Sequence, residues 1–411
     1  MTLALALAAC SSRVAPGKGE PQPAPEVSLP PLTPEGVETE GQEGFGPGQG
    51  FAAADDGDTK VALLVPLSGR HARVGEALVN AAQMALFDVA DDRFSLLVQD
   101  TGGTPDGAQS AARAALQKGV KLIIGPLFSG SARLVANEAL PYGINVVSFS
   151  NDRSVAGGGL YVMGLSPADQ VARVVAYSAS RGLRRFAILA PRGAYGDIVM
   201  RSLQQTAFNL GLQITRAAVF DPAISDASTE VRSIAPPPDP SGEGVLEADY
   251  DAIMLPMGGK TLLSVSPLLP YYDIDPGAVR FLGTALWDNP TLGTEPSLQG
   301  GWFAAPPPDL WQSFKERYAS LYGSKPPRIA SLGYDAAALA SVLANRGAEL
   351  GDPSVFDVEG LTQASGFSGI DGIFRFMPTG EAQRGLAVLE MRRGGFRLLS
   401  PAPQSFEDLT S

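Results

Sequence analysis

Five consecutive apolar residues, Val61-Ala62-Leu63-Leu64-Val65, followed by Pro66-Leu67-Ser68-Gly69, decide the fold. A short, continuously apolar run of this kind is typical of a strand that is covered on both faces. A helical stripe follows over residues 74–90, where apolar residues recur every three or four positions. A second apolar run then spans residues 94–98. This strand–helix–strand order predicts a βαβ unit in a parallel sheet.

The same alternation continues along the chain in two sets. The first set adds predicted helices at 108–118 and 131–140 and predicted strands at 122–124 and 145–149. The second set has predicted helices at 168–180 and 196–210 and predicted strands at 186–190, 212–220 and 252–255. Two such sets predict an α/β fold with two doubly wound parallel-sheet lobes.

Composition excludes several classes of function. The 411 residues carry 31 Lys+Arg and 43 Asp+Glu, a formal charge of −12, with one His and one Cys. An acidic chain is poorly suited to neutralising phosphates, so nucleic acid is not an expected partner. His71 and Cys10 cannot supply the roughly four ligands of a structural zinc site, and only His71 could serve a catalytic triad. We therefore expect no metal site, no cofactor and no enzymatic activity.

Cys10 ends the short apolar run Met1–Ala9, which is too short to span a bilayer. The run is typical of the end of a signal peptide, and Leu7-Ala8-Ala9-Cys10 resembles the bacterial lipobox, whose Cys is lipidated. The alternatives are an incidental Cys in a plain secretory signal or in a cytosolic N-terminus. Ser11 resembles the residue that follows the Cys in lipoproteins sorted to the outer membrane. We expect a lipid anchor in the outer membrane, with the protein facing the periplasm, and a start codon upstream of Met1 remains open.

Residues 11–58 have a different composition from the rest of the chain. They contain 8 Pro, 9 Gly and 9 Asp+Glu against 2 Lys+Arg. Few large apolar side chains are present, so burial cannot offset the roughly 1–2 kcal/mol per residue that backbone ordering costs. We expect a disordered tether between the signal-peptide end, residues 1–10, and a folded part over residues 59–411.

Small hydroxyl residues follow several of the predicted strands. In open parallel sheets, ligands bind beyond the carboxyl ends of the strands. Hydroxyls and backbone N–H groups that converge there can hold a carboxylate. The alternative for Ser129 is an ordinary helix cap. The residues expected to line a ligand cleft are Ser68, Asp100, Ser129, Ser148, Ser150 and Tyr195.

Short motifs along residues 59–399 resemble the type I periplasmic-binding-protein superfamily, in its leucine/isoleucine/valine-binding-protein branch. The matching stretches include Leu64–Gly69, Ile123–Pro126, Tyr195-Gly196, Gly333–Ala336 and Phe367–Gly372. The resemblance implies two lobes joined by a hinge that the chain crosses three times, near residues 165, 283 and 346. Lobe one would hold residues 59–165 and 283–345, and lobe two residues 166–282 and 346–400. The segment Trp302–Ala305 would then be a lobe-one strand.

Within the superfamily, Phe281–Trp287 and Arg384–Val388 most resemble the penicillin-binding-protein activator group, lipoproteins related to the C-terminal domain of LpoA. The resemblance implies a non-catalytic envelope lipoprotein that binds and activates a peptidoglycan synthase and so regulates cell-wall synthesis. The alternative is the substrate-binding lipoprotein of an ABC transporter for branched-chain or polar amino acids. A hydrolase or transferase would need a base and a nucleophile in one site, and the sequence offers no such pair.

The resemblance departs from amino-acid binders at one position. Those proteins place an acidic residue just after a Phe-x-Gly turn to hold the ligand's ammonium group. Here Gly283 is followed by Thr284-Ala285-Leu286, and the nearest acid is Asp288. An unpaired ammonium in a closed cleft is costly, so we expect free amino acids to bind weakly, with Asp100 or Asp288 as possible substitutes. A small carboxylate remains a possible ligand.

Overall fold

The computed structural model describes residues 59–223, 226–241 and 244–407. The expected signal-peptide end with Cys10, and the expected tether over residues 11–58, lie outside the described residues. From Thr59 onward the chain forms three sheets with helices on their faces.

The first sheet is parallel and forms the centre of lobe one. Its strand order is β2-β1-β3-β4-β5. The central strand β1 is hydrogen-bonded on both sides, and its residues Val61–Val65 are fully buried. The strands are β1 (Thr59–Val65), β2 (Phe94–Asp100), β3 (Leu122–Ile124), β4 (Asn145–Ser148) and β5 (Leu160–Val162).

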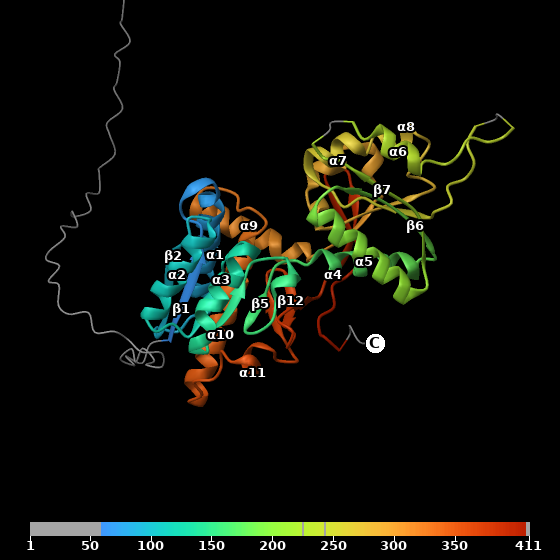
Figure 1. Cartoon of the computed structure of the whole chain (residues 1–411). Helices are drawn as coiled ribbons and strands as arrows, with labels where there is room; N and C mark the ends of the chain where they lie inside the picture. The colour runs from blue at the N-terminus through green and yellow to red at the C-terminus, as the bar shows by residue number, and fades with distance from the viewer. Residues whose placement is uncertain (1–58, 224–225, 242–243, 408–411) are drawn as a thin grey trace, which may run out of the picture. The chain divides into compact units, whose positions relative to one another are not determined.

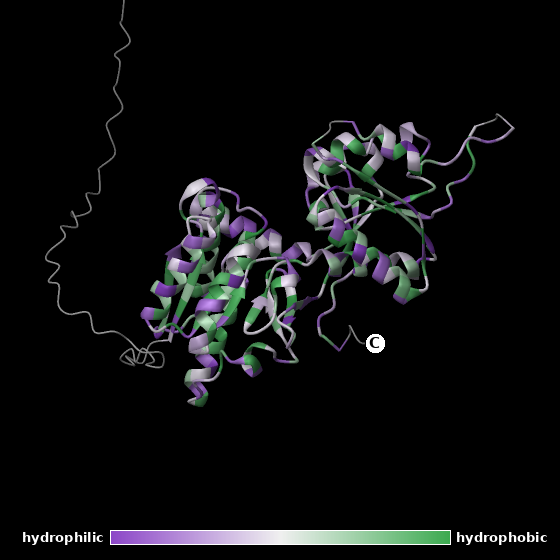
Figure 2. Cartoon of the chain, in the orientation of Figure 1, coloured by the Kyte–Doolittle hydropathy of each residue, from purple (hydrophilic) through white to green (hydrophobic). Residues whose placement is uncertain are grey.

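Helices cover both faces of this sheet. Val61, Leu63 and Val65 pack with α1 and α10, whereas Ala62 and Leu64 pack with α2 and α3. The apolar colouring of the strands between the helices reflects this double burial (Figure 2). Figure 1 shows α10, from late in the chain, beside the elements that follow β1. The helices of lobe one are α1 (Ala72–Val89), α2 (Pro105–Gln117), α3 (Ser129–Ala139), α9 (Pro308–Tyr322), α10 (Ala330–Leu350) and α11 (Val358–Leu361).

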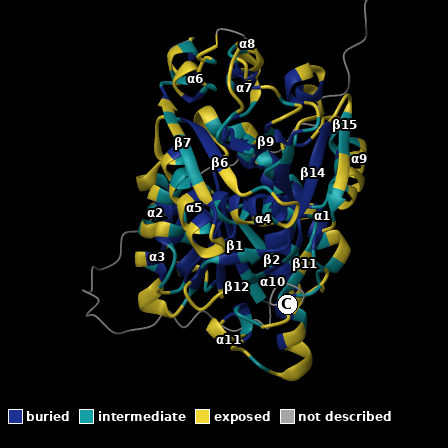
Figure 3. Ribbon diagram, turned by 90° about the vertical axis from the view of Figure 1, so that its right-hand side faces the viewer, coloured by how far each residue is buried: buried dark blue, intermediate teal, exposed yellow. Residues whose placement is uncertain are grey.

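The second sheet forms the centre of lobe two, with the order β15-β14-β10-β9-β8-β6-β7. The run from β7 to β10 is parallel, whereas β14 and β15 are antiparallel additions. Interior strands such as β14 are buried, and the edge strands β7 and β15 are more exposed (Figure 3). The strands are β6 (Arg185–Pro191), β7 (Gln213–Phe220), β8 (Ala252–Met254), β9 (Arg280–Gly283), β10 (Trp302–Ala305), β14 (Ala387–Arg392) and β15 (Gly395–Ser400). The helices are α4 (Pro167–Ser180), α5 (Ala194–Leu210), α6 (Ser228–Ile234), α7 (Gly259–Val265) and α8 (Leu268–Tyr271).

A small antiparallel sheet completes lobe one. It consists of β11 (Phe367–Gly369), β12 (Gly372–Phe376) and β13 (Ala382–Arg384). Phe374 and Phe376 of β12 belong to the same apolar cluster as Tyr161 of β5. The third sheet therefore extends the lobe-one core.

The chain passes between the lobes three times, but two of the expected crossing points were wrong. The first crossing lies between β5 and α4, near residue 165 as predicted. The second lies between β10 and α9 rather than near residue 283, and the third lies between β13 and β14 rather than near residue 346. Lobe one therefore holds about residues 59–164 and 307–385, and lobe two about residues 166–305 and 386–400.

The placement of Trp302–Ala305 in lobe one is the clearest of these errors. This segment is β10, which pairs in parallel with β9 and antiparallel with β14, both in the lobe-two sheet. Its side chain Phe303 is fully buried in the lobe-two core, where it packs near Trp287. The physical reason is that β14, from the end of the chain, needs β10 as its hydrogen-bonding neighbour.

Charged side chains tie the lobes together at the crossings. Arg153 of lobe one forms an ion pair with Asp169, in the first turn of α4 in lobe two. The buried side chain of Arg384, at the third crossing, donates to the carbonyl oxygen of Met163 at the first, with an Nη2 to O distance of 2.9 Å. These contacts hold two of the three connecting segments against each other.

The helices α1 and α10 approach each other closely at Gly333. An ideal Cβ on Gly333 would lie 2.5 Å from the carbonyl oxygen of Leu78 and 3.0 Å from its Cα. A side chain at this position would push the two helices apart. Glycine is therefore required here by packing.

We predict that Gly333→Ala destabilises the protein by about 1–3 kcal/mol, because over-packing a close helix contact strains the backbone. Gly130→Ala is the matched control, since Gly130 lies in α3 and a Cβ there would meet nothing within 4 Å. Urea unfolding followed by circular dichroism measures both. Equal midpoints for the two variants would contradict the prediction.

Candidate ligand cleft

A cavity of about 640 Å³ lies beyond the carboxyl ends of β3 and β4 and takes its walls from both lobes. Lobe one contributes the loops after these strands and the start of α10. Lobe two contributes the beginnings of α4 and α5 and the turn after β9. Its position agrees with the general location of ligands in open parallel sheets. The lining residues are His71, Val74, Leu127, Phe128, Ser129, Phe149, Ser150, Asn151, Gly164, Leu165, Gln170, Tyr195, Ala285, Leu286, Asp288, Pro306, Arg328, Ile329, Ser331, Leu332 and Asp371.

Three of the six expected cleft residues line this cavity: Ser129, Ser150 and Tyr195. Ser129 is the first residue of α3, and Phe128 is at the N-cap position with no side-chain hydrogen bond, so Ser129 does not act as the cap. The Tyr195 hydroxyl lies 2.8 Å from Thr284 Oγ1. Burial raises the pKa of the Tyr195 phenol above its usual value, which keeps it protonated.

The other three, Ser68, Asp100 and Ser148, are not among the residues that line the cavity. Asp100 Oδ1 accepts hydrogen bonds from the backbone N–H groups of Leu67, Ser68 and Gly102 at 2.7–3.3 Å. A hydrogen bond from the Ser68 side chain is the largest cause that lowers the pKa of Asp100 below its usual value. The fully buried Ser148 donates to the carbonyl oxygen of Pro126 at 2.8 Å. These polar groups shape the loops around the cleft instead of facing a ligand.

The sequence prediction missed the most strongly charged part of the cleft, which centres on Arg328. Arg328 precedes α10, and its Nε donates to Asp288 Oδ2 at 3.0 Å while its Nη1 donates to Asp371 Oδ1 at 2.6 Å. Its guanidinium carbon lies 4.5 Å from the centre of the Trp311 ring. Burial alone would lower the pKa of Arg328, but the two carboxylates outweigh it and raise the pKa above its usual value.

Both acidic partners of Arg328 are held in place by neighbours. Asp371 is fully buried and also accepts a hydrogen bond from Ser331 Oγ at 2.9 Å. Asp288 follows the turn Ala285–Trp287, in which the buried indole of Trp287 donates to Met257 O at 3.1 Å. The backbone N–H of Ala285 donates to Gln170 Oε1 at 2.8 Å. The Arg328–Asp288 pair therefore joins two rigid supports, one in each lobe.

Two sequence signals pointed toward this cluster. Asp288 is the acid nearest the Phe-Leu-Gly turn, and Asp371 lies in the quoted motif Phe367–Gly372. Arg328 lies in no motif, and only the folded chain brings it to residues 40 and 43 positions away. Pairing across the cleft could not be predicted from local pattern.

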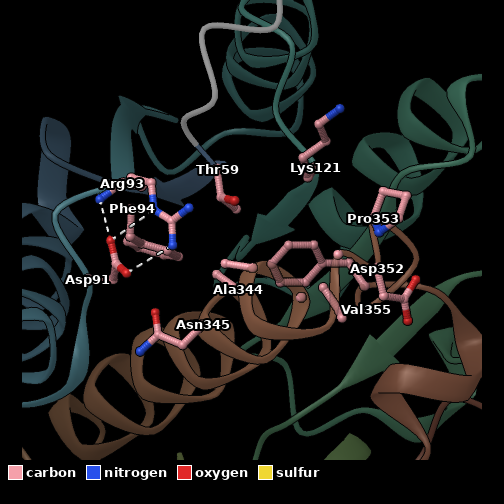
Figure 4. A pocket seen from close by; sticks show the side chains of 14 residues that line it. Thr59, Asp91, Arg93, Phe94, Lys121, Ala344, Asn345, Asp352, Pro353 and Val355 are labelled. Carbon is pink, nitrogen blue, oxygen red and sulfur yellow. Dashed lines mark hydrogen bonds and ion pairs between the residues drawn. The ribbon is translucent and has the colours of Figure 1, made fainter.

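A second cavity, of about 410 Å³, lies at the opposite end of β1 (Figure 4). It is bordered by Thr59, the first residue of β1, by Phe94, the first residue of β2, and by the end of α10. Asp91 and Arg93 at its edge pair with each other. Because this cavity lies at the amino ends of the parallel strands, we assign the functional site to the cleft.

Within residues 59–223, 226–241 and 244–407, no group of three or more His, Cys, Asp or Glu side chains is arranged to hold a metal ion. No helix in the described part of the chain combines the length and the apolarity that crossing a membrane requires. The polar groups of the cleft are thus hydroxyls, one guanidinium and two carboxylates.

Known proteins resemble this chain over its folded part. A region of 157 residues is 27% identical to the Leu/Ile/Val-binding protein BraC3 of Rhizobium johnstonii, covering 36% of this chain and 43% of that protein. A region of 150 residues is 23% identical to the penicillin-binding protein activator LpoA of Vibrio cholerae, covering 36% of this chain and 25% of that protein. The chain therefore spans less than half the length of these curated relatives.

Among solved structures, the periplasmic ligand-binding protein of a branched-chain amino acid ABC transporter from Burkholderia xenovorans superposes with a TM-score of 0.66 at 18% identity. The match covers 84% of this chain and 95% of that one, and it shows the common fold. The family model described as periplasmic binding protein matches residues 58–395. With the two-lobed α/β architecture and the cleft, this match shows that the chain belongs to the periplasmic binding protein family, in its leucine/isoleucine/valine-binding-like type I form.

Proposed function

We propose that this protein is a non-catalytic envelope lipoprotein that binds and activates a penicillin-binding protein, a peptidoglycan synthase. One observation carries the proposal: both carboxylates that line the cleft, Asp288 and Asp371, are already bound by Arg328. A receptor that delivers free amino acids needs a carboxylate that is available to the ligand's ammonium group. In this cleft that demand is met by the protein's own guanidinium.

The energetic argument favours a cleft that is not adapted to free amino acids. A charged ammonium moved out of water without a paired carboxylate costs several kcal/mol. Binding one beside Asp288 would require Arg328 to give up or share a hydrogen bond at 3.0 Å. The similarity to LpoA, which is printed as a penicillin-binding protein activator, supports the same role.

A second candidate is the substrate-binding lipoprotein of an ABC transporter for branched-chain or polar amino acids. The observation that favours it is the position of Asp288, whose side chain lines the cleft and is 11% exposed. The similarity to BraC3 favours it as well. A small carboxylate held by the hydroxyls of Ser129 and Ser150 would fit the same cleft.

The full-length protein, purified in detergent, should raise the rate of glycan polymerisation by a purified bifunctional penicillin-binding protein from the same envelope. The same preparation should show no shift of its thermal unfolding midpoint with leucine at micromolar concentrations, because the cleft offers the ammonium group no unpaired carboxylate. The gel-based polymerisation assay and differential scanning fluorimetry measure the two effects. An unchanged synthase rate together with a leucine-induced shift would select the transporter role instead.

For localisation, the proposal rests on lipidation of Cys10. Acyl chains that insert into the outer membrane give stable anchoring when at least two are present. Cys10→Ala should therefore move the protein from the membrane fraction to the soluble periplasmic fraction and remove palmitate labelling. Cys10→Ser, which preserves side-chain size, should behave in the same way. Retention of membrane fractionation and label in both variants would refute the anchor.

A further inference from the structure

We infer that Arg328 is the specificity-determining residue of the cleft: it takes the place of a ligand's ammonium group and so excludes free amino acids in favour of ligands that bring an oxygen acceptor. The inference rests on the proposed function, in which the cleft takes no free amino acid, and it names the residue responsible and the ligand class that remains. Three independent features of the cleft carry it.

The first feature is the bonding of Arg328. Its Nε and Nη1 engage one carboxylate in each lobe, Asp288 in lobe two and Asp371 in lobe one. A ligand ammonium placed between the lobes would use these same oxygens. Arg328 thus bridges the cleft in the way that a positively charged ligand group would.

The second feature is the fixed position of the guanidinium. It stacks on Trp311, and its Nη1 also donates to Ser331 Oγ at 2.9 Å. Three neighbours on lobe one therefore hold the side chain, namely Trp311, Ser331 and Asp371. A ligand cannot move Arg328 aside without breaking several interactions together.

The third feature is an unused donor. Arg328 Nη2 is buried and has no hydrogen-bond partner among the described residues. A buried donor without an acceptor is unfavourable, so an oxygen supplied by a ligand would be stabilised there. The remaining polar lining includes the hydroxyls of Ser129, Ser150 and Tyr195, which can donate to the same class of ligand.

The rest of the lining is apolar and suits a hydrocarbon body. The side chains that provide it are Val74, Leu127, Phe128, Phe149, Leu165, Leu286, Ile329 and Leu332. With Arg328 in place, the ligand class is an aliphatic or aromatic carboxylate without an α-ammonium group. Leucine and 4-methylpentanoate differ in that one group, so this pair of probes isolates the effect of Arg328.

The test compares full-length variants by isothermal titration with each probe. The main variant is Arg328→Gln with Asp371→Asn, because removing Arg328 alone would leave Asp371 buried without a counter-ion. It leaves Asp288 as the single unpaired carboxylate among the residues that line the cleft. The matched control adds Asp288→Asn, and Arg328→Lys retains the cation. Circular dichroism verifies that each variant is folded.

The Arg328→Gln/Asp371→Asn variant should shift the ratio of leucine to 4-methylpentanoate affinity by about 10- to 100-fold toward leucine, the range expected for one buried charge-assisted hydrogen bond. The triple variant and Arg328→Lys should not show this shift. An unchanged ratio in the folded main variant, or an equal shift in the triple variant, would overturn the inference without bearing on synthase activation. Micromolar leucine binding by the unaltered protein would overturn it as well, whereas loss of the proposed function is read separately, from the synthase assay.

Discussion

A parallel sheet must be covered on both faces, and in lobe one the cover of one face comes from the far end of the sequence. Helix α10 packs on β1 beside α1, and the Tyr334 hydroxyl donates to Asp88 across 246 positions of chain. The chain must therefore build lobe two and then return to complete lobe one. The three crossings, the cleft between the lobes and the meeting of Arg328 with Asp288 all follow from that return. The close contact at Gly333 is where this constraint is tightest.

Much of this architecture could be predicted from the sequence. Apolar runs located the central strands correctly, because a strand buried on both faces needs apolar residues at consecutive positions, as in Val61–Val65. Strand β10 was assigned to the wrong lobe for a physical reason. Its four residues, Trp302–Ala305, carry no mark of their partner, and that partner is set by hydrogen bonds to β9 and β14. Local pattern identifies a strand, whereas its sheet depends on neighbours that are distant in sequence.

The cleft shows the same division between local and distant information. Ser129, Ser150 and Tyr195 were predicted because they follow strands at the edge where ligands bind. Ser148 and Asp100 also follow strands, yet nearby backbone groups satisfy them first, and residue type alone does not reveal such competition. Arg328 was missed because its role depends on two acids that only folding brings near. A site built from charge pairs across a cleft is thus less visible in sequence than one built from loops of a single sheet.

The place where the folded part begins has a mechanical consequence. Thr59 is the first residue of β1, which is hydrogen-bonded to β2 on one side and to β3 on the other. A pull on the segment that precedes Thr59 is therefore received by the centre of a sheet. Two hydrogen-bond ladders must break together before β1 yields, whereas a load on an edge strand such as β2 would open one ladder from its end. A chain that is held by its N-terminal side while a partner draws on its folded part would resist that force at its strongest strand.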